Sequence, residues 1–251
     1  MMLHGGVITA MGTFFVFSDY MKPAIRMAAL MRTPVKFIYS HDAFRVGEDG
    51  PTHQPVEHEA QLRLMEKLQN HMGEDSVRVF RAADADEMTV CWQMAMENMD
   101  TPTALILSRQ NIKSLPEGND YQKARKGAYV VAGSDEQYDV ILLASGSEVS
   151  TLVEGAELLR KDGVRCRVVS VPSEGLFRRQ PVGYQLLVLP SEAKVFGMTA
   201  GLPVTLQGLV GCHGRVFGMN SFGFSAPYKV LDEKLGFTPE NVYKQVKEFL
   251  A

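Results

Sequence analysis

The chain has 251 residues, of which 45% are hydrophobic and 22% are charged, and its formal net charge is −3 at pH 7. This composition supports one large domain or two small ones, and it excludes a disordered chain, a collagen-like repeat and a disulfide-stapled mini-protein. The balanced charge gives no general affinity for nucleic acid or for anionic membranes. No apolar run approaches the ~20 residues that span a bilayer.

The cysteines Cys91, Cys166 and Cys212 lie far apart in the sequence and form no CxxC pair. An odd, scattered set is typical of a reducing compartment and argues against a zinc ribbon. The apolar N-terminus carries no basic segment and is interrupted by glycines, so it lacks the pattern of a secretory signal peptide. We therefore expect a cytoplasmic protein.

Short apolar runs alternate with helical patterns along the chain, which indicates α/β layers. The runs show no apolar–polar alternation, as expected for parallel strands covered on both faces. The predicted strands are residues 34–40, 77–80, 103–107, 139–144, 164–170 and 194–198. Helices are predicted from a cap at Asp19 to about residue 31, over 56–69, after a cap at Asp84 or Asp86, over 147–159, and from a cap at Thr238 with Pro239 at the first helical position.

Residues 113–137 form the expected linker between two domains. They are rich in glycine, proline and polar residues, and their only apolar island is residues 128–132. We therefore divide the chain into residues 1–119 and 120–251.

The densest group of chemically active side chains lies in residues 39–58, YSHDAFRVGEDGPTHQPVEH, just after a predicted strand. Ligands of open α/β sheets bind outside the carboxyl ends of the strands. The glycines and prolines permit a folded loop that brings His41 and His53 together, where imidazoles suit proton transfer or anion binding. A purely structural polar loop is the alternative. The string HQPVEH does not match the HxxEH zinc motif, and Pro55 obstructs the helix that such a motif needs.

Three further segments have candidate roles. Arg109 follows a strand in SRQN and suits bidentate binding of a phosphate or carboxylate, the alternative being an ion pair with a nearby acid. The aromatic cluster in residues 12–20 is either core or pocket lining. Residues 145–148, SGSE, resemble an anion-binding helix start without the phosphate-loop pattern.

Several strings occur here in the order found in transketolases, and together they cover nearly the whole chain. They are GTFFVFSDY, MAALM, HDAFRVGEDGPTHQPVEH, ADADE, PTALILSRQN, LASGSEVS, RVVSVPSEGLF, SFGFSAPYKVL and LGFTPENV. The chain therefore resembles the transketolase family. The resemblance implies two three-layer α/β/α domains with mostly parallel sheets: residues 1–119 as the later part of a pyrimidine-binding domain, incomplete at its N-terminus, and 120–251 as the C-terminal domain.

The resemblance also implies a chemistry and a set of site residues. Transketolases use thiamine diphosphate and a divalent cation, Mg²⁺ or Ca²⁺, to move a two-carbon ketol unit between sugar phosphates of the pentose phosphate pathway. By resemblance, three aromatic residues face the cofactor's pyrimidine, two histidines are catalytic and also bind substrate, and two charged residues complete the substrate site. The aromatic residues are Phe14, Phe17 and Tyr20, the histidines are His41 and His53, and the charged residues are Asp49 and Arg109.

The sequence departs from the family pattern in several places. The family string HDSIG is HDAFR here, which changes the loop at Ala43, Phe44 and Arg45, and residues 62–76 lengthen a connection that we expect at the surface. The GDG metal motif and the glutamate of the REH motif are absent, so no residue of this chain is assigned to the metal. We expect activity only with a pyrophosphate-binding half, in a homodimer of the complete enzyme or with a partner chain.

Other functions remain open on this pattern. Within the superfamily, the rivals are a deoxyxylulose-phosphate synthase and a pyruvate dehydrogenase beta-type subunit. Outside enzymes, the rivals are an inactive truncated chain and an assembly or binding module.

Overall fold

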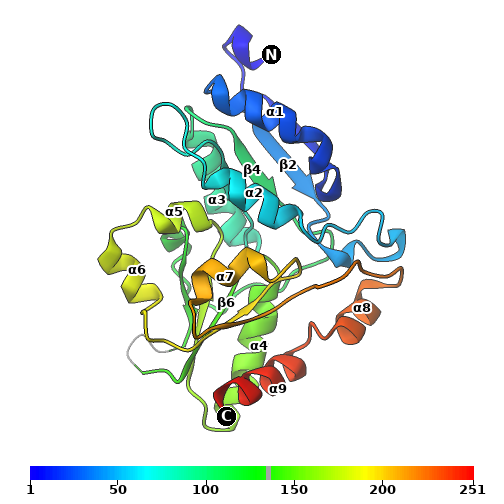
Figure 1. The fold of residues 1–251 in the computed structure, drawn as a ribbon, viewed down its shortest axis with the longest axis vertical. Coiled ribbons are helices and arrows are strands. Elements are labelled where there is room, and N and C mark those ends of the chain that lie inside the picture. The colour runs from blue at the N-terminus through cyan, green and yellow to red at the C-terminus, as the bar shows by residue number, and fades with distance from the viewer. Residues whose placement is uncertain (134–136) are drawn as a thin grey trace.

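The computed structural model describes residues 1–133 and 137–251. Within them the strands form two sheets, and helices cover both faces of each sheet (Figure 1). We call residues 10–106 the N-terminal unit and residues 121–250 the C-terminal unit. The connecting residues 107–120 belong to no helix or strand. The exact division after residue 119 remains a prediction.

The N-terminal unit contains a four-stranded sheet with the order β1-β2-β4-β3, in which every paired strand is parallel. The strands are β1 (Ala10–Phe14), β2 (Lys36–Ser40), β3 (Arg78–Phe80) and β4 (Thr103–Ile106). The three predicted strands are thus confirmed. The edge strand β1 was not predicted, because its sequence AMGTF has no run of β-branched residues.

Three α-helices and two 3₁₀ segments complete this unit, and a further 3₁₀ segment, η1, precedes it. They are η1 (Met2–His4), η2 (Phe15–Phe17), α1 (Ser18–Leu30), η3 (Phe44–Asp49), α2 (His58–Glu66) and α3 (Ala85–Glu97). The predicted cap at Asp19 is wrong, because Asp19 lies inside the first turn of α1. The cap at Asp84 is confirmed: its Oδ1 accepts a hydrogen bond of 2.8 Å from the Glu87 N–H.

The C-terminal unit contains a five-stranded sheet with the order β5-β7-β6-β8-β9, parallel except for the β5–β7 pair. Its strands are β5 (Tyr129–Ala132), β6 (Val140–Ala144), β7 (Cys166–Ser170), β8 (Val195–Met198) and β9 (Arg215–Phe217). The three central strands are the predicted ones. The prediction missed β5 and β9, both at sheet edges; β5 is the apolar island that was assigned to the linker.

The helices of the C-terminal unit lie on both faces of its sheet. They are η4 (Tyr121–Lys126), α4 (Glu148–Lys161), α5 (Glu174–Arg178), α6 (Val182–Val188), α7 (Val204–Val210), α8 (Tyr228–Leu235) and α9 (Pro239–Leu250). Helix α4 packs against α9 on one face, while α5, α6 and α7 supply residues to the cluster on the other. Thr238 caps α9 as predicted, since its Oγ1 accepts from the Asn241 N–H.

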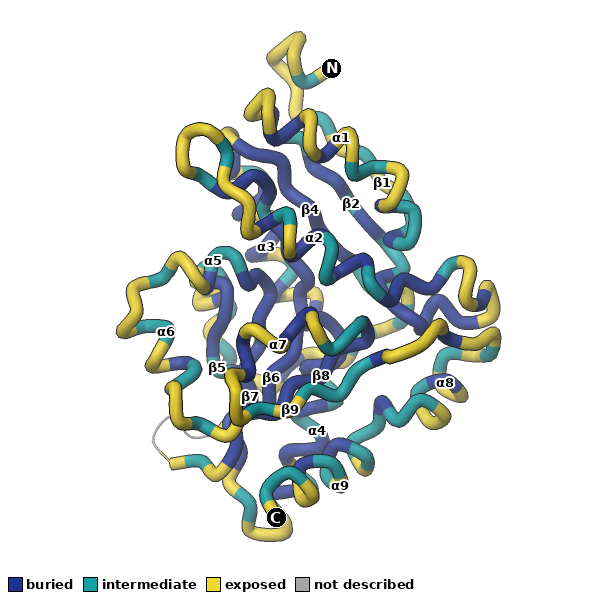
Figure 2. The backbone as a smooth tube through the Cα atoms, in the orientation of Figure 1, coloured by how far each residue is buried: buried dark blue, intermediate teal, exposed yellow. Residues whose placement is uncertain are grey.

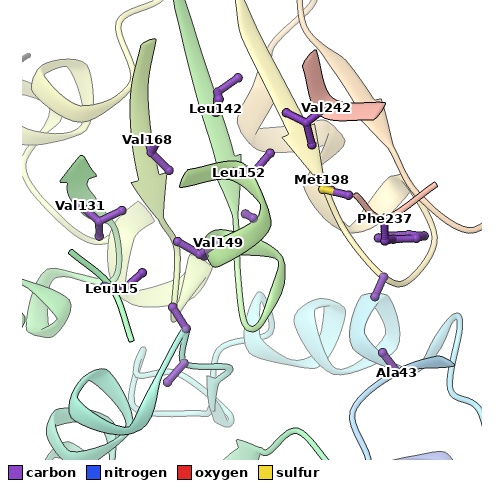
Figure 3. Packing of buried hydrophobic residues seen from close by; sticks show 14 of the residues in the cluster. Ala43, Leu115, Val131, Leu142, Val149, Leu152, Val168, Met198, Phe237 and Val242 are labelled. Carbon is purple, nitrogen blue, oxygen red and sulfur yellow. The ribbon is translucent and has the colours of Figure 1, made fainter. Parts of the chain in front are cut away.

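The two units share one hydrophobic cluster. It joins Ala43 and Phe44 of the N-terminal unit to Met198 and Phe237 of the C-terminal unit, as Figure 3 shows for Ala43 and Phe237. The strands of both sheets are drawn mostly in the dark blue of buried residues (Figure 2). The loop after β2 therefore packs against the C-terminal unit.

The lengthened connection of residues 62–76 lies only partly at the surface. Leu62, Arg63 and Glu66 are buried on α2, whereas most of residues 67–74 are exposed in a turn. The expectation of a surface segment is therefore right for the turn and wrong for the helix. No helix in the described parts of the chain is both long and apolar enough to cross a membrane.

Candidate functional site

The candidate site lies at the carboxyl edge of the N-terminal sheet. Parallel pairing sets Phe14 at the end of β1 opposite Ser40 at the end of β2, and His41 follows directly. Strand β4 ends beside β2 in the same direction, so the segment carrying Arg109 leaves the sheet at this edge too. Three segments far apart in the sequence are thus brought to one edge by strand order alone.

An aromatic cluster forms one side of the site. The rings of Phe14 and Phe17 lie 6.3 Å apart, and Tyr20 lies 6.2 Å from Phe17. The His41 imidazole stacks on Phe14 at 3.7 Å, and the His53 ring meets Phe17 edge-on at 5.5 Å. The structure therefore brings together all five predicted aromatic and histidine residues.

Local chain geometry explains how these rings meet. The 3₁₀ turn η2 follows β1 directly, and it places Phe15 in the core while Phe14 and Phe17 stay half-buried at the site. The Tyr20 side of the cluster is open, since Tyr20 is 79% exposed. The sequence left open whether this cluster is core or pocket lining, and each alternative holds for part of it. Phe15 is core, and its neighbours line the site.

Each histidine is fixed by a hydroxyl next to it in the sequence. Nδ1 of His41 lies 2.9 Å from Ser40 Oγ, and Nδ1 of His53 lies 2.9 Å from Thr52 Oγ1. His41 adopts a φ of 61°, a left-handed conformation that is unfavourable for a residue with a side chain. Burial lowers the pKa of His41, as does the Arg109 guanidinium, while Asp49 and Asp42 act in the opposite direction. The neutral imidazole is therefore favoured.

Asp49 and Arg109 complete the predicted set, and both are exposed. Both act on the pKa of His41, which places their charges around the same imidazole. No carboxylate of the described residues lies within ion-pair distance of Arg109. The alternative role of Arg109, pairing with a nearby acid, is not seen, and its guanidinium is open to a ligand.

A buried ion network lies beneath the loop. Asp42 Oδ2 accepts from Arg81 at 2.7 Å, and Arg81 Nη1 also donates to Glu148 Oε2 at 2.5 Å. The Arg81 guanidinium also fills the helix start that the sequence suggested as an anion site, since a Cβ on Gly146 would lie 2.5 Å from Arg81 Cζ. That suggestion is corrected: residues 145–148 bind a side chain of the protein.

Sequence reasoning missed two supporting residues, Arg81 and Arg45. Arg81 follows β3 and is 1% exposed, and Arg45 is 4% exposed and binds Glu148 and Asp232. A signal was present, because a charged residue inside an otherwise apolar packed segment needs a buried partner. The partner residues could not be identified from the sequence, since they lie far along the chain.

Family models match both units. Residues 1–114 match the transketolase pyrimidine-binding domain, and residues 127–238 match the transketolase-like C-terminal domain. The fold and these two matches define a chain of the transketolase-like class of α/β proteins.

Comparison with individual proteins narrows the class. The chain is 44% identical to the transketolase of Halalkalibacterium halodurans over 253 residues, which is all of this chain and 37% of that protein. It superimposes on the transketolase of Leishmania mexicana with a TM-score of 0.90 and 37% identity, covering 99% of this chain and 35% of that one. The chain belongs to the transketolase family, and it spans a little over a third of the length of these relatives.

A third likeness concerns the fold alone. A split-gene transketolase, solved as an inactive β4 tetramer, matches with a TM-score of 0.73 and 24% identity. The match covers 98% of this chain and 77% of that one. A separate chain can therefore have this fold of two α/β units.

Proposed function

We propose that this chain supplies the pyrimidine-facing and substrate-facing side of a transketolase site. The observation that carries the proposal is the convergence of Phe14, His41 and Arg109 at one sheet edge. This edge combines an aromatic face, two imidazoles and a guanidinium that has no ion pair among the described residues. Those are the groups that a planar cofactor ring, a sugar hydroxyl and a phosphate each require.

The aromatic residues fit the thiamine diphosphate that the family implies. Phe14 and Phe17 are half-buried and Tyr20 is exposed, so their rings keep apolar surface that this chain does not cover. When bound, thiamine diphosphate supplies the carbon nucleophile for cleaving the donor ketose and carrying its two-carbon unit. The described residues contain no cluster of three or more His, Cys, Asp or Glu able to hold a metal ion. We propose that Mg²⁺ or Ca²⁺ is bound by the pyrophosphate-binding half.

His41 and His53 move protons at the substrate hydroxyl and carbonyl oxygens. Their Nδ1 atoms are held by Ser40 and Thr52, and within the described residues their Nε2 atoms are left for a ligand. A neutral His41 with its hydrogen on Nε2 donates a hydrogen bond to an oxygen that gains charge. In the other tautomer, Nε2 accepts the proton of a substrate hydroxyl, and the resulting imidazolium returns it.

Charged groups position the sugar phosphate. The exposed Asp49 accepts hydrogen bonds from hydroxyl groups of the ketose. Arg109 binds the terminal phosphate through two parallel N–H groups, which fixes the distance between that phosphate and the reacting carbonyl. The substrate class is therefore a phosphorylated sugar of the pentose phosphate pathway, handled in the cytoplasm.

The cofactor's diphosphate and metal are bound by a second half, either in a homodimer of the complete enzyme or in a partner chain. The split-gene transketolase of the same fold is inactive as a β4 tetramer, and we expect the same inactivity of this chain by itself. The names of the relatives favour a transketolase over a deoxyxylulose-phosphate synthase or a pyruvate dehydrogenase subunit. An assembly module without catalysis is the remaining alternative.

A reconstitution assay tests the proposal. The chain is assayed for ketol transfer with thiamine diphosphate and Mg²⁺, alone and with a polypeptide corresponding to the first two thirds of a transketolase. We expect turnover only in the mixture. Robust turnover by the chain alone would contradict the division of the site, and a mixture that forms a complex without turnover would favour the assembly module.

A further inference from the structure

The loop that carries the candidate site is attached to the C-terminal unit by hydrogen bonds and ion pairs. This loop, residues 41–54, lies in the connection between β2 and α2 and contains His41, Asp49 and His53. Its middle is a 3₁₀ segment that contacts α8, and both lie on the same side of the molecule (Figure 1). Arg45 is the charged residue of this segment that points inward, with only 5% of its side chain exposed.

Arg45 makes three hydrogen bonds to the C-terminal unit. Its Nε donates to Asp232 Oδ1 at 2.7 Å, and its Nη1 donates to Glu148 Oε1 at 2.7 Å and to Ser147 Oγ at 3.0 Å. The guanidinium also lies 5.8 Å from the centre of the Phe237 ring. The planar guanidinium of Arg45 thus bridges the start of α4 and the side of α8. The ammonium group of a lysine is a single point charge and does not bond both at once.

Glu148 holds the same loop at a second position. Its other oxygen, Oε2, accepts from Arg81, and Arg81 in turn binds Asp42, the residue next to His41. One carboxylate of the C-terminal unit is therefore connected to the loop at residues 42 and 45. This matters because the left-handed backbone of His41 is costly, and such a conformation persists only where the surroundings over-determine it.

The far end of the loop is attached as well. Gln54 Nε2 donates to the carbonyl oxygens of Phe44 and Phe224, each at 2.9 Å, and Ser225 Oγ donates to the Glu48 carbonyl at 2.6 Å. The C-terminal unit thus contacts the loop at residues 45, 48 and 54. None of these hydrogen bonds involves His41 or His53.

We propose that Arg45 is a positioning residue for the candidate site. It ties the loop to Glu148 and Asp232, so that the C-terminal unit determines where His41, Asp49 and His53 lie. The catalytic part of this inference rests on the proposed function, while the positioning part rests on the contacts alone. It assigns a task to the C-terminal unit, none of whose residues was predicted to touch cofactor or substrate.

The chain should tolerate loss of this arginine. In Arg45→Met, the buried Glu148 keeps its pair with Arg81, and the partly exposed Asp232 remains open to water. No buried charge is left without a partner, which is the usual cause of severe loss. Arg45→Lys keeps the charge but bonds one carboxylate at a time. Asp232→Asn removes one of the two ion pairs.

Hydrogen exchange of the 251-residue chain measures the attachment directly. We expect Arg45→Met to raise the exchange rate of the Val46, Gly50 and His53 amides at least tenfold, with Arg45→Lys and Asp232→Asn in between. These amides are protected by hydrogen bonds inside the loop. The matched control is Arg125→Met, because Arg125 joins η4 to Glu97 of α3 without touching the loop.

The outcomes separate positioning from general stability and from the proposed function. Unchanged loop exchange in Arg45→Met, or faster exchange throughout the chain, would overturn the proposal. In the reconstituted enzyme, we expect Arg45→Met to lower kcat at least tenfold with little change in KM for a phosphorylated acceptor, and Arg45→Lys to restore part of kcat. If His41→Ala and His53→Ala leave turnover unchanged, the proposed function fails while the exchange result still decides the attachment.

Discussion

The Phe14 ring lies flat against the His41 imidazole, with ring centres 3.7 Å apart and planes 15° apart. This stack fixes the plane of the imidazole, and the hydrogen bond between Nδ1 and the Ser40 hydroxyl limits rotation of the ring within that plane. The two contacts hold a histidine whose backbone is strained and whose pKa is lowered. A group held in this way is pre-organised for proton transfer, which is the basis of the first prediction.

His41→Ala and His53→Ala should each lower kcat of the reconstituted enzyme by roughly 10²–10⁴-fold, the usual contribution of general acid–base catalysis. The fold should be retained, because both rings lie at the half-buried edge of the sheet. Steady-state kinetics at saturating substrate measures the effect, with the exposed His71→Ala as the matched control. Rates within a few-fold of wild type would mean that these histidines are structural.

The pKa of His41 should rise in Arg109→Ala. Arg109 is a positive charge near the imidazole, so it disfavours the protonated form, and its removal leaves Asp49 and Asp42 acting alone against burial. Titration of the imidazole signals by NMR measures this in the chain without cofactor. A pKa that is unchanged by the substitution would show that Arg109 does not lie beside His41 in solution.

Phe17→Ala should weaken the use of thiamine diphosphate more than the use of acceptor. An aromatic face contributes roughly 0.5–1.5 kcal/mol beyond the area that it buries, and truncation also opens a cavity. The measurement is the cofactor concentration that gives half-maximal activity. Phe15→Leu is the control, because Phe15 is buried in the core of the N-terminal unit and should change stability alone.

Glu87→Gln should be more stable than wild type at pH 8 and should differ little from it at pH 5. Burial raises the pKa of Glu87 to about 7 in the folded chain, whereas the ordinary value is 4.5. A raised pKa means stability that is present below pH 4.5 and is lost as the pH rises to about 7, at a cost of about 3 kcal/mol. Glutamine cannot ionise, so the variant should gain in melting temperature only at the higher pH. An equal change at both pH values would contradict the raised pKa.

The central strands were predictable because they are buried on both faces. Residues 140–144 form a continuous apolar run, and residues 36–40 contain the apolar run FIY, as expected for strands with helices on both faces of the sheet. Of the four edge strands, β3 was predicted, whereas β1, β5 and β9 escaped prediction. A glycine interrupts β1, β5 is a short apolar stretch among polar and glycine residues, and β9 has only three residues. Strand prediction from apolar runs therefore finds the middle of a sheet better than its edges.

The site was predictable only as far as it is local. The glycines and prolines of residues 47–55 indicated a folded loop, and the loop does bring His53 to the rings beside His41. The ion network beneath was not predictable, because Arg45 is 103 residues from Glu148 and 187 residues from Asp232 along the chain. Contacts at such separations follow from the packing of the two units, which no local pattern encodes.

The most direct test of the account concerns Arg109, because the proposed role of this sheet edge is to bind a sugar phosphate. Kinetic series on the reconstituted enzyme compare a phosphorylated acceptor with the unphosphorylated glycolaldehyde. Loss of a charge-assisted bidentate pair should raise KM for the phosphorylated acceptor by roughly ten- to a hundredfold in Arg109→Ala, with some fall in kcat, and Arg109→Lys should recover part of the loss. The account predicts that KM for glycolaldehyde changes little. Equal losses for both acceptors would contradict it, since Arg109 would then hold the loop and not the ligand.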